Sequence, residues 1–299
     1  MKDESVSIEN RQLILDFVHS MQAHSVKSRR LTKSIHILSI ISRLLNKEFK
    51  LAEKKDIEVV FALIENSSYA DWTKYDFKVV TKRFYKWLLG DDEEYPLCVK
   101  WIKSKEPKNH TLPEELITPE EIKKLIEVTD NPRDRALISL LYESGARIAE
   151  LLSLKIKHIE FGEKVTTVLL DGKTGPRKIP VITSTPHLKI WLSFHPFRNN
   201  SNAMLWTKLI IRQEQGRTKE EALSYDGIRK LLQKLFAKIS LKKDCNPHLF
   251  RHSRATFLAK HLTEAQLKIF FGWTQSSGMA CRYVHMSGRD LNEVILNIQ

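Results

Sequence analysis

The chain has 299 residues, with 49 basic and 36 acidic side chains and a formal net charge of +13. This length is enough for two domains of ordinary size. No apolar run approaches the roughly 20 residues that a membrane span needs, and the N-terminus lacks a signal-peptide pattern. Cys98, Cys245 and Cys281 form no CxxC pair, which is typical of a reducing compartment. These features exclude a membrane-spanning or disulfide-stapled class and predict a cytoplasmic protein.

The positive charge is unevenly distributed. Residues 1–100 carry 17 basic and 15 acidic side chains, a net charge of +2, so +11 of the total belongs to the remainder. An excess of this size favours a polyanionic partner, most simply nucleic acid. A generally basic, soluble surface is the alternative that charge alone leaves open.

Residues 7 to about 90 read as four helices with few breakers. Apolar residues recur at spacings of three and four, as on one face of a helix, and the fourth pattern ends at Gly90. Four helices of this length predict a small bundle. Between the first two patterns lies a basic segment whose side chains suit a DNA backbone or a solvated loop: Lys27, Arg29, Arg30 and Lys33.

A domain boundary is predicted where the helical pattern stops. Residues 103–116 are polar, contain Pro107 and Pro113, and read as a linker. The next helix begins with Thr118 as N-cap and Glu121 completing a capping box. We therefore expect a helical domain over residues 1–102, a linker over 103–116 and a second domain over 117–299.

The second domain mixes helices with a small amount of strand. A helix over 134–144 ends at Gly145, where a C-cap glycine belongs. The β-branched runs 165–170 and 178–182 flank a turn-rich segment and read as a hairpin. Helical patterns resume over 188–194, 227–239 and from 247 onward, whereas residues 196–225 are too weakly patterned to place.

Several side chains in this domain suit phosphate chemistry. Arg147 and Glu150 share one helix face, and an exposed ion pair is the alternative reading. His248 and Arg251 lie one turn apart, and arginine binds phosphate through a planar fork of donors. His248 and His252 are spaced like a zinc pair, but no HExxH arrangement accompanies them. About thirty residues later, Tyr283 has an oxygen able to form a covalent intermediate.

These residues carry a resemblance to a known family. His248-x-x-Arg251-His252-Ser253-x-Ala255-Thr256, Gly272-Trp273 and Tyr283-Val284-His285 resemble the C-terminal motifs of tyrosine recombinases, the integrase and Xer group. The segment 145–151 resembles the first arginine motif of that family, and 172–175 resembles its lysine-bearing hairpin. The residues of these motifs are most similar to those of archaeal Xer-like members.

The resemblance implies a fold and a set of roles. The fold is mainly α with a small antiparallel β-sheet, as a SAM-like core-binding domain followed by a catalytic domain. Tyr283 is then the nucleophile, Lys173 the general acid and His248 the general base or a phosphate contact. Trp273 either donates a hydrogen bond to a phosphate oxygen or is a plain core residue. Arg147 and Arg251 clamp the phosphate, Glu150 supports Arg147, and His252 is structural. Lys178 is a less mobile alternative to Lys173.

The implied reaction is metal-free and needs no cofactor or ATP. Strand exchange would proceed through a 3′-phosphotyrosyl link on double-stranded DNA, in a homotetramer. A type IB topoisomerase-like enzyme and a catalytically silent DNA-binding protein remain alternatives. A final helix over 289–298 has an apolar stripe, which either folds back onto its own domain or passes to a neighbouring protomer.

Overall fold

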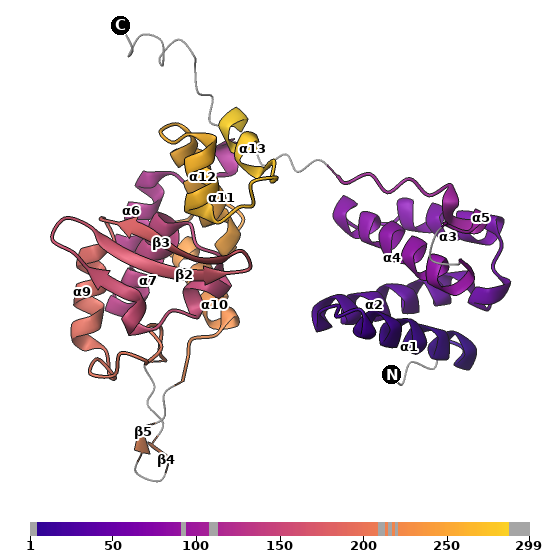
Figure 1. Cartoon of the computed structure of the whole chain (residues 1–299), viewed down its shortest axis with the longest axis horizontal. Coiled ribbons are helices and arrows are strands. Elements are labelled where there is room, and N and C mark those ends of the chain that lie inside the picture. The colour runs from indigo at the N-terminus through magenta and orange to yellow at the C-terminus, as the bar shows by residue number, and fades with distance from the viewer. Residues whose placement is uncertain are drawn as a thin grey trace, which may run out of the picture. The chain divides into compact units, whose positions relative to one another are not determined.

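The computed structural model describes residues 5–90, 94–107, 113–208, 213–214, 217–218 and 221–286. The chain divides into two compact units, 1–110 and 111–299. The described part is mostly helical with a small antiparallel sheet, as Figure 1 shows, which confirms the predicted fold class. None of the helices in these ranges has the length and apolar character required to cross a membrane.

The first unit is built from the predicted helices. These are α1 (Ile8–Ala23), α2 (Ser28–Leu45), α3 (Lys54–Glu65) and α4 (Asp71–Leu89), followed by the short α5 (Leu97–Lys100). Phe84 of α4 is fully buried and meets Phe17 and Phe49 edge to face, with ring centroids 5.4 and 4.7 Å apart. The buried Asn10 amide donates to Ser42 Oγ and to the Lys47 carbonyl, which joins α1 to the end of α2.

The second unit is organised around one helix. It contains α6 (Pro119–Glu127), α7 (Pro132–Ser144), α8 (Ile148–Leu152), α9 (Thr185–Phe194), α10 (Tyr225–Lys238), α11 (Pro247–Ala259), α12 (Glu264–Phe271) and α13 (Met279–Met286). Nearly all of α7 is buried, and it packs against α6, α9, α11 and the sheet. A helix covered on all sides in this way fixes the positions of the elements that carry the site.

A three-stranded antiparallel sheet lies in the second unit, in the order β1 (Ile159–Phe161), β2 (Thr166–Gly172) and β3 (Gly175–Val181). The predicted hairpin is confirmed, and Gly172 pairs with Gly175, so Lys173 and Thr174 form its turn. The weakly patterned region includes two two-residue strands, β4 (Gln213–Glu214) and β5 (Arg217–Thr218). It also supplies Trp206, a fully buried side chain whose indole donates to the Leu151 carbonyl at 2.8 Å.

The ends of helices were predicted correctly where neighbouring residues determine them. Thr118 and Glu121 form the capping box at the start of α6. Gly145, the predicted C-cap, takes the left-handed conformation after α7 with φ of 54°. Gly272 takes the same conformation after α12, with φ of 59°. A side chain at Gly145 would also meet the Phe271 ring, at 2.5 Å from the first added carbon.

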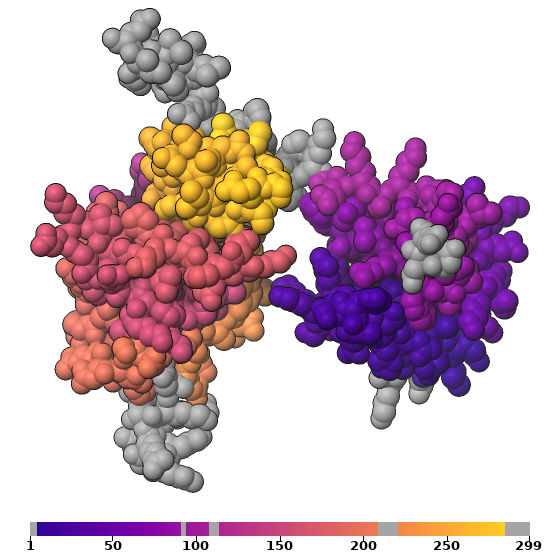
Figure 2. Space-filling model, in the orientation of Figure 1, coloured from indigo at the N-terminus to yellow at the C-terminus, as the bar shows by residue number. Residues whose placement is uncertain are grey.

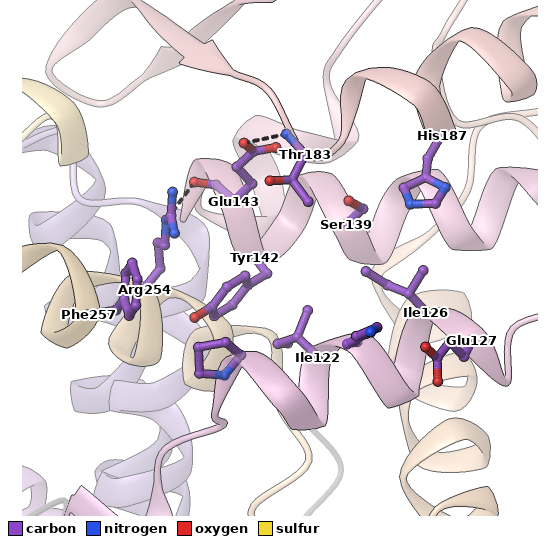
Figure 3. A pocket seen from close by; sticks show the side chains of 12 residues that line it. Ile122, Ile126, Glu127, Ser139, Tyr142, Glu143, Thr183, His187, Arg254 and Phe257 are labelled. Carbon is purple, nitrogen blue, oxygen red and sulfur yellow. Dashed lines mark hydrogen bonds between the residues drawn. The ribbon is translucent and has the colours of Figure 1, made fainter.

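The buried Glu143 carboxylate fixes the chain between β3 and α9. It accepts hydrogen bonds from the backbone N–H groups of Ile182, Thr183 and Ser184 at 2.7 to 2.9 Å. Figure 3 shows the contact with Thr183 and, beside it, Arg254 of α11 donating to the Glu143 carbonyl. Because α7, α9 and α11 meet here, the helix that carries His248 and Arg251 is held firmly against the central helix.

Candidate active site

Arg251 is the most deeply buried cation of the site. It is 6% exposed, and its guanidinium donates to the Gly145 carbonyl at 2.8 Å and to the Phe271 carbonyl at 2.7 Å. It also lies over the Phe271 and Trp273 rings, 5.0 and 5.6 Å from their centroids. Burial, together with the nearby Arg147 charge, lowers the pKa of Arg251 to about 10. The side chain is still a cation at neutral pH.

Arg147 lies at the N-terminus of α8 and is partly open to solvent, with a side chain 33% exposed. The Arg147 guanidinium donates to Glu150 Oε1 at 2.7 Å, and the backbone N–H of Arg147 donates to Glu150 Oε2 at 3.0 Å. The predicted Arg147–Glu150 pairing is therefore present, but Glu150 is 3% exposed and the pair is not a surface one. Arg147 follows the turn at Gly145 that Arg251 binds, so both arginines are attached to the same short stretch of backbone.

Arg177 is a second partner of Glu150 that the sequence reasoning missed. Its guanidinium donates to Glu150 Oε2 at 2.7 Å and to Oε1 at 3.3 Å, and its Nε donates to the Phe270 carbonyl at 3.1 Å. The alternation of β3 contained the signal, because Arg177 shares a strand face with the buried Ile179 and Val181. Glu150 therefore joins β3, α8 and the end of α12 through two arginines.

The balance of effects on Glu150 decides its charge. Burial alone raises the pKa of this carboxyl, but hydrogen bonds from Arg177 and Arg147 outweigh burial and lower it. The carboxylate is therefore ionised at neutral pH and carries one negative charge between two positive ones. Such a buried group is stable only while its partners are present.

Lys173 is exposed at the turn between β2 and β3. The turn is held near the site because Thr174 Oγ1 donates to the Gly272 carbonyl at 3.0 Å. Gly172 packs so closely on Glu150 that an added side-chain carbon would lie 2.2 Å from Oε1. Lys178, the alternative lysine, instead pairs with Glu160 on the exposed side of the sheet at 3.5 Å. Figure 2 shows the yellow surface of the last described helices against the rose surface of the sheet.

Tyr283 lies on α13 and is 3% exposed. Its ring stacks on Trp273 with centroids 5.4 Å apart and an interplanar angle of 2°, and Trp273 stacks on Phe271. Burial raises the pKa of the Tyr283 phenol, whereas the positive charges of Arg251 and Arg282 act in the opposite direction. The hydroxyl is therefore buried near positive charges, and it keeps its proton at rest.

His252 is hydrogen-bonded to the Tyr283 hydroxyl through Nδ1. His248, four residues earlier on α11, is exposed at the rim of the site. Burial lowers the pKa of His248, and the positive charges of Arg251 and Arg147 lower it further. The structure thus brings together Arg147, Glu150, Arg251, Trp273 and Tyr283, with His248 beside the arginines and Lys173 on the adjoining turn. His252, expected to be structural, contacts the tyrosine oxygen.

The remaining predicted site residues lie in the first unit. Lys27, Arg29 and Arg30 are exposed at the start of α2. Lys33 forms an ion pair with Asp76 of α4. The predicted helix over 289–298 lies outside the described residues.

A fold and site of this kind define a class of protein, and the chain belongs to the phage integrase family, whose model matches residues 115–289. Its relatives include Tyrosine recombinase XerA of Pyrococcus horikoshii, 32% identical over 154 residues, which are 50% of each chain. Tyrosine recombinase XerC of Anoxybacillus flavithermus is 30% identical over 186 residues, which are 59% of each chain. The matched region thus spans about half to three fifths of these relatives. The predicted kinship with Xer-type tyrosine recombinases is confirmed.

Solved structures share the fold. A lambda integrase dimer bound to a COC′ core site has a TM-score of 0.71 at 15% identity, covering 96% of this chain and 80% of that one. The XerH site-specific recombinase bound to a palindromic difH substrate has a TM-score of 0.68 at 18% identity, covering 97% and 84%. At these identities the likeness concerns the fold alone.

Proposed function

We propose that this chain is a site-specific DNA recombinase that cleaves and rejoins strands through a 3′-phosphotyrosyl intermediate. One observation carries the proposal: Arg147, Arg251, His248 and Tyr283 come from three different elements and lie close enough that the charge of Arg251 acts on His248 and Tyr283, and the charge of Arg147 acts on His248 and Arg251. A phosphodiester is the group that two guanidinium groups and a phenol oxygen can bind and attack together. The positive net charge of residues 101–299 favours DNA as the molecule that supplies this phosphodiester.

Each side chain has a role in this proposal. The Tyr283 oxygen attacks phosphorus and displaces the 5′ oxygen, which Lys173 protonates from the adjoining turn. Arg147 and Arg251 stabilise the charge on the pentacoordinate phosphorus, an effect of several kcal/mol in an enclosed site. Trp273 and His248 complete the phosphate pocket, and Glu150 orients Arg147. Because the bond energy is stored in the protein–DNA link, resealing requires no ATP.

The proposed partner is double-stranded DNA with specific sites, bound by a homotetramer. XerH was solved on a difH substrate, and lambda integrase as a tetramer on a Holliday junction. In this chain the exposed Lys27, Arg29 and Arg30 suit contacts with the DNA backbone by a domain over residues 1–102. A catalytic domain over residues 117–299 carries the chemistry. The first unit is thus proposed as the core-binding domain, joined by the linker 103–116.

The decisive experiment replaces the nucleophile. The DNA site is first selected from random duplexes by binding to the whole chain, and a nicked suicide version of that site is then prepared. Tyr283→Phe should bind this duplex as the unchanged chain does but form no covalent adduct, because the phenol oxygen is absent. An undiminished adduct in Tyr283→Phe would contradict the assignment of Tyr283.

Relaxation and silent binding remain the competing functions. A supercoiled plasmid with a single site distinguishes the two activities. A relaxing enzyme converts it to the relaxed form, whereas recombination needs two sites and gives no recombinant product from it. Salt-sensitive DNA binding with no adduct in the unchanged chain would indicate a silent DNA-binding protein. We expect products only from paired sites.

A further inference from the structure

The neighbour of the Tyr283 hydroxyl is a histidine for which the proposed mechanism has no use. His252 follows Arg251 on α11, and its Nδ1 meets the Tyr283 oxygen. The two rings lie 5.8 Å apart between centroids, and the Tyr283 ring also stacks on Trp273. Stacking fixes the ring of Tyr283, and the hydrogen bond joins its oxygen to His252.

The imidazole is in the form that accepts a proton. Burial lowers the pKa of His252 to about 4, and the charges of His248, Arg282 and Arg251 contribute to the lowering. At neutral pH the ring is therefore uncharged, and in the tautomer that has its proton on Nε2, Nδ1 can accept the hydrogen bond that the Tyr283 hydroxyl donates. His248 makes no such contact with Tyr283 in the described part of the chain.

A route for the proton leads away from the tyrosine. His252 also lines a cavity of about 930 Å³, together with His248, Lys242, Lys243 and Tyr225. A proton received at the buried end of the imidazole can therefore be released from the ring to solvent in this cavity. The buried Tyr283 is absent from the cavity lining, so the phenol has no comparable exit of its own there.

Resting on the recombinase function proposed above, we propose that His252, and not His248, accepts the tyrosine proton during strand cleavage. As the Tyr283 oxygen forms its bond to phosphorus, its O–H bond breaks and the proton passes to His252 Nδ1. The phosphorus–oxygen bond to the 5′ side breaks in the same step, and that oxygen receives a proton from Lys173. Rejoining reverses each transfer, so atoms and charge balance over the cycle. His248 then serves phosphate contact alone.

Attack and proton transfer have to be coupled. The phenol pKa is raised and the imidazole pKa is lowered, so the proton stays on Tyr283 until phosphorus draws electron density from the oxygen. This arrangement protects a resting protein from a free phenolate. It also predicts that removing the acceptor slows cleavage by about 100-fold or more, the usual contribution of a positioned base.

The experiment measures single-turnover adduct formation on the nicked suicide duplex described above, with protein saturating. His252→Asn retains a side-chain oxygen that can accept a hydrogen bond but does not take up a proton at neutral pH. We expect its adduct rate to fall about 100-fold and to rise with pH, as hydroxide replaces the lost base. His261→Asn, an exposed histidine just beyond α11, is the matched control and should keep the rate of the unchanged chain.

A second variant guards against simple loss of folding. His252→Ala should also be slow, and added imidazole should restore part of its rate without changing the rate of His252→Asn or of the unchanged chain. A merely structural histidine would give low DNA binding and an early thermal unfolding transition, with no rescue by imidazole.

The outcomes separate this proposal from the one on which it rests. An unchanged or faster adduct in His252→Asn would overturn the role of His252, and a faster one would mean that the hydrogen bond restrains Tyr283. The same role falls if added imidazole restores the adduct rate of His248→Ala but not that of His252→Ala. Failure of the unchanged chain to form any adduct dependent on Tyr283 would instead overturn the proposed recombinase function, and His252 with it.

Discussion

Two groups of basic side chains are both positively charged, but one group is fixed by the fold and the other is exposed to solvent. In the second unit, Arg251 is buried and the Arg177 side chain is 9% exposed, and the two bind backbone carbonyls and a carboxylate. At the start of α2 in the first unit, Lys27, Arg29 and Arg30 are exposed. The buried group has its geometry fixed before any ligand arrives, which suits stabilisation of a transition state. The exposed group suits salt-dependent attraction to a polyanion.

The largest expected effect comes from removing the fork of Arg251 while keeping its charge. Arg251→Lys cannot satisfy both the Gly145 and Phe271 carbonyls, so we expect the free energy of unfolding to fall by about 2–4 kcal/mol. The adduct rate should fall about 100-fold or more. Urea unfolding and single-turnover cleavage measure the two effects. Arg29→Lys is the matched exposed control, and its free energy of unfolding should change by less than about 0.5 kcal/mol.

Arg177 distinguishes a buried pair from a surface pair within one strand. Arg177→Ala leaves Glu150 with one cation and the Phe270 carbonyl without its donor, so the free energy of unfolding should fall by about 3 kcal/mol. Lys178→Ala removes only the exposed contact with Glu160 and should cost less than about 0.5 kcal/mol. Chemical denaturation of the two variants gives the comparison directly. Equal losses in both would show that Arg177 is not a structural link.

The pH dependence of stability should report on Glu150. Its folded pKa is lowered, so its contribution is complete above the ordinary carboxyl pKa and is lost as pH falls through the folded value. At neutral pH the unchanged chain should exceed Glu150→Gln by about 1–3 kcal/mol in unfolding free energy. The difference should shrink as the pH approaches 3. A gap that widens on acidification would mean that the carboxyl is protonated in the folded protein.

The smallest effects on stability are expected in the exposed group, where binding changes instead. Lys27→Ala, Arg29→Ala and Arg30→Ala should each weaken DNA binding and reduce the slope of log affinity against log salt by about one. Their thermal unfolding should match that of the unchanged chain. Lys33 is engaged with Asp76, so Lys33→Ala should change the salt slope less than the other three. Titrations at several salt concentrations separate these variants.

Sequence reasoning succeeded where a few neighbouring residues determine the structure. The box at Thr118 and the glycine after α7 are set by local backbone and capping chemistry. Motif spacing predicted Arg147, Glu150, Arg251, Trp273 and Tyr283 as one group, and their side chains lie near one another in the structure.

Contacts between distant segments were not predictable in the same way. Arg177 looked like one more basic residue in a hairpin, although strand alternation placed it inward. Trp206 came from a stretch without periodicity, and its burial depends on packing against α8. The contact of His252 with Tyr283 joins residues 31 positions apart, and helix spacing says nothing about which side chain of α13 meets α11.

The attachment of Arg251 to the Gly145 carbonyl has a consequence for how this site can vary. Arg147 follows that glycine by two residues, so the separation between the two guanidinium groups is set by main-chain atoms and one left-handed turn. Substitutions elsewhere in the site are therefore expected to leave this separation unaltered. Redesign for new targets should therefore leave the 145–147 turn untouched and confine its changes to surfaces that read the bases.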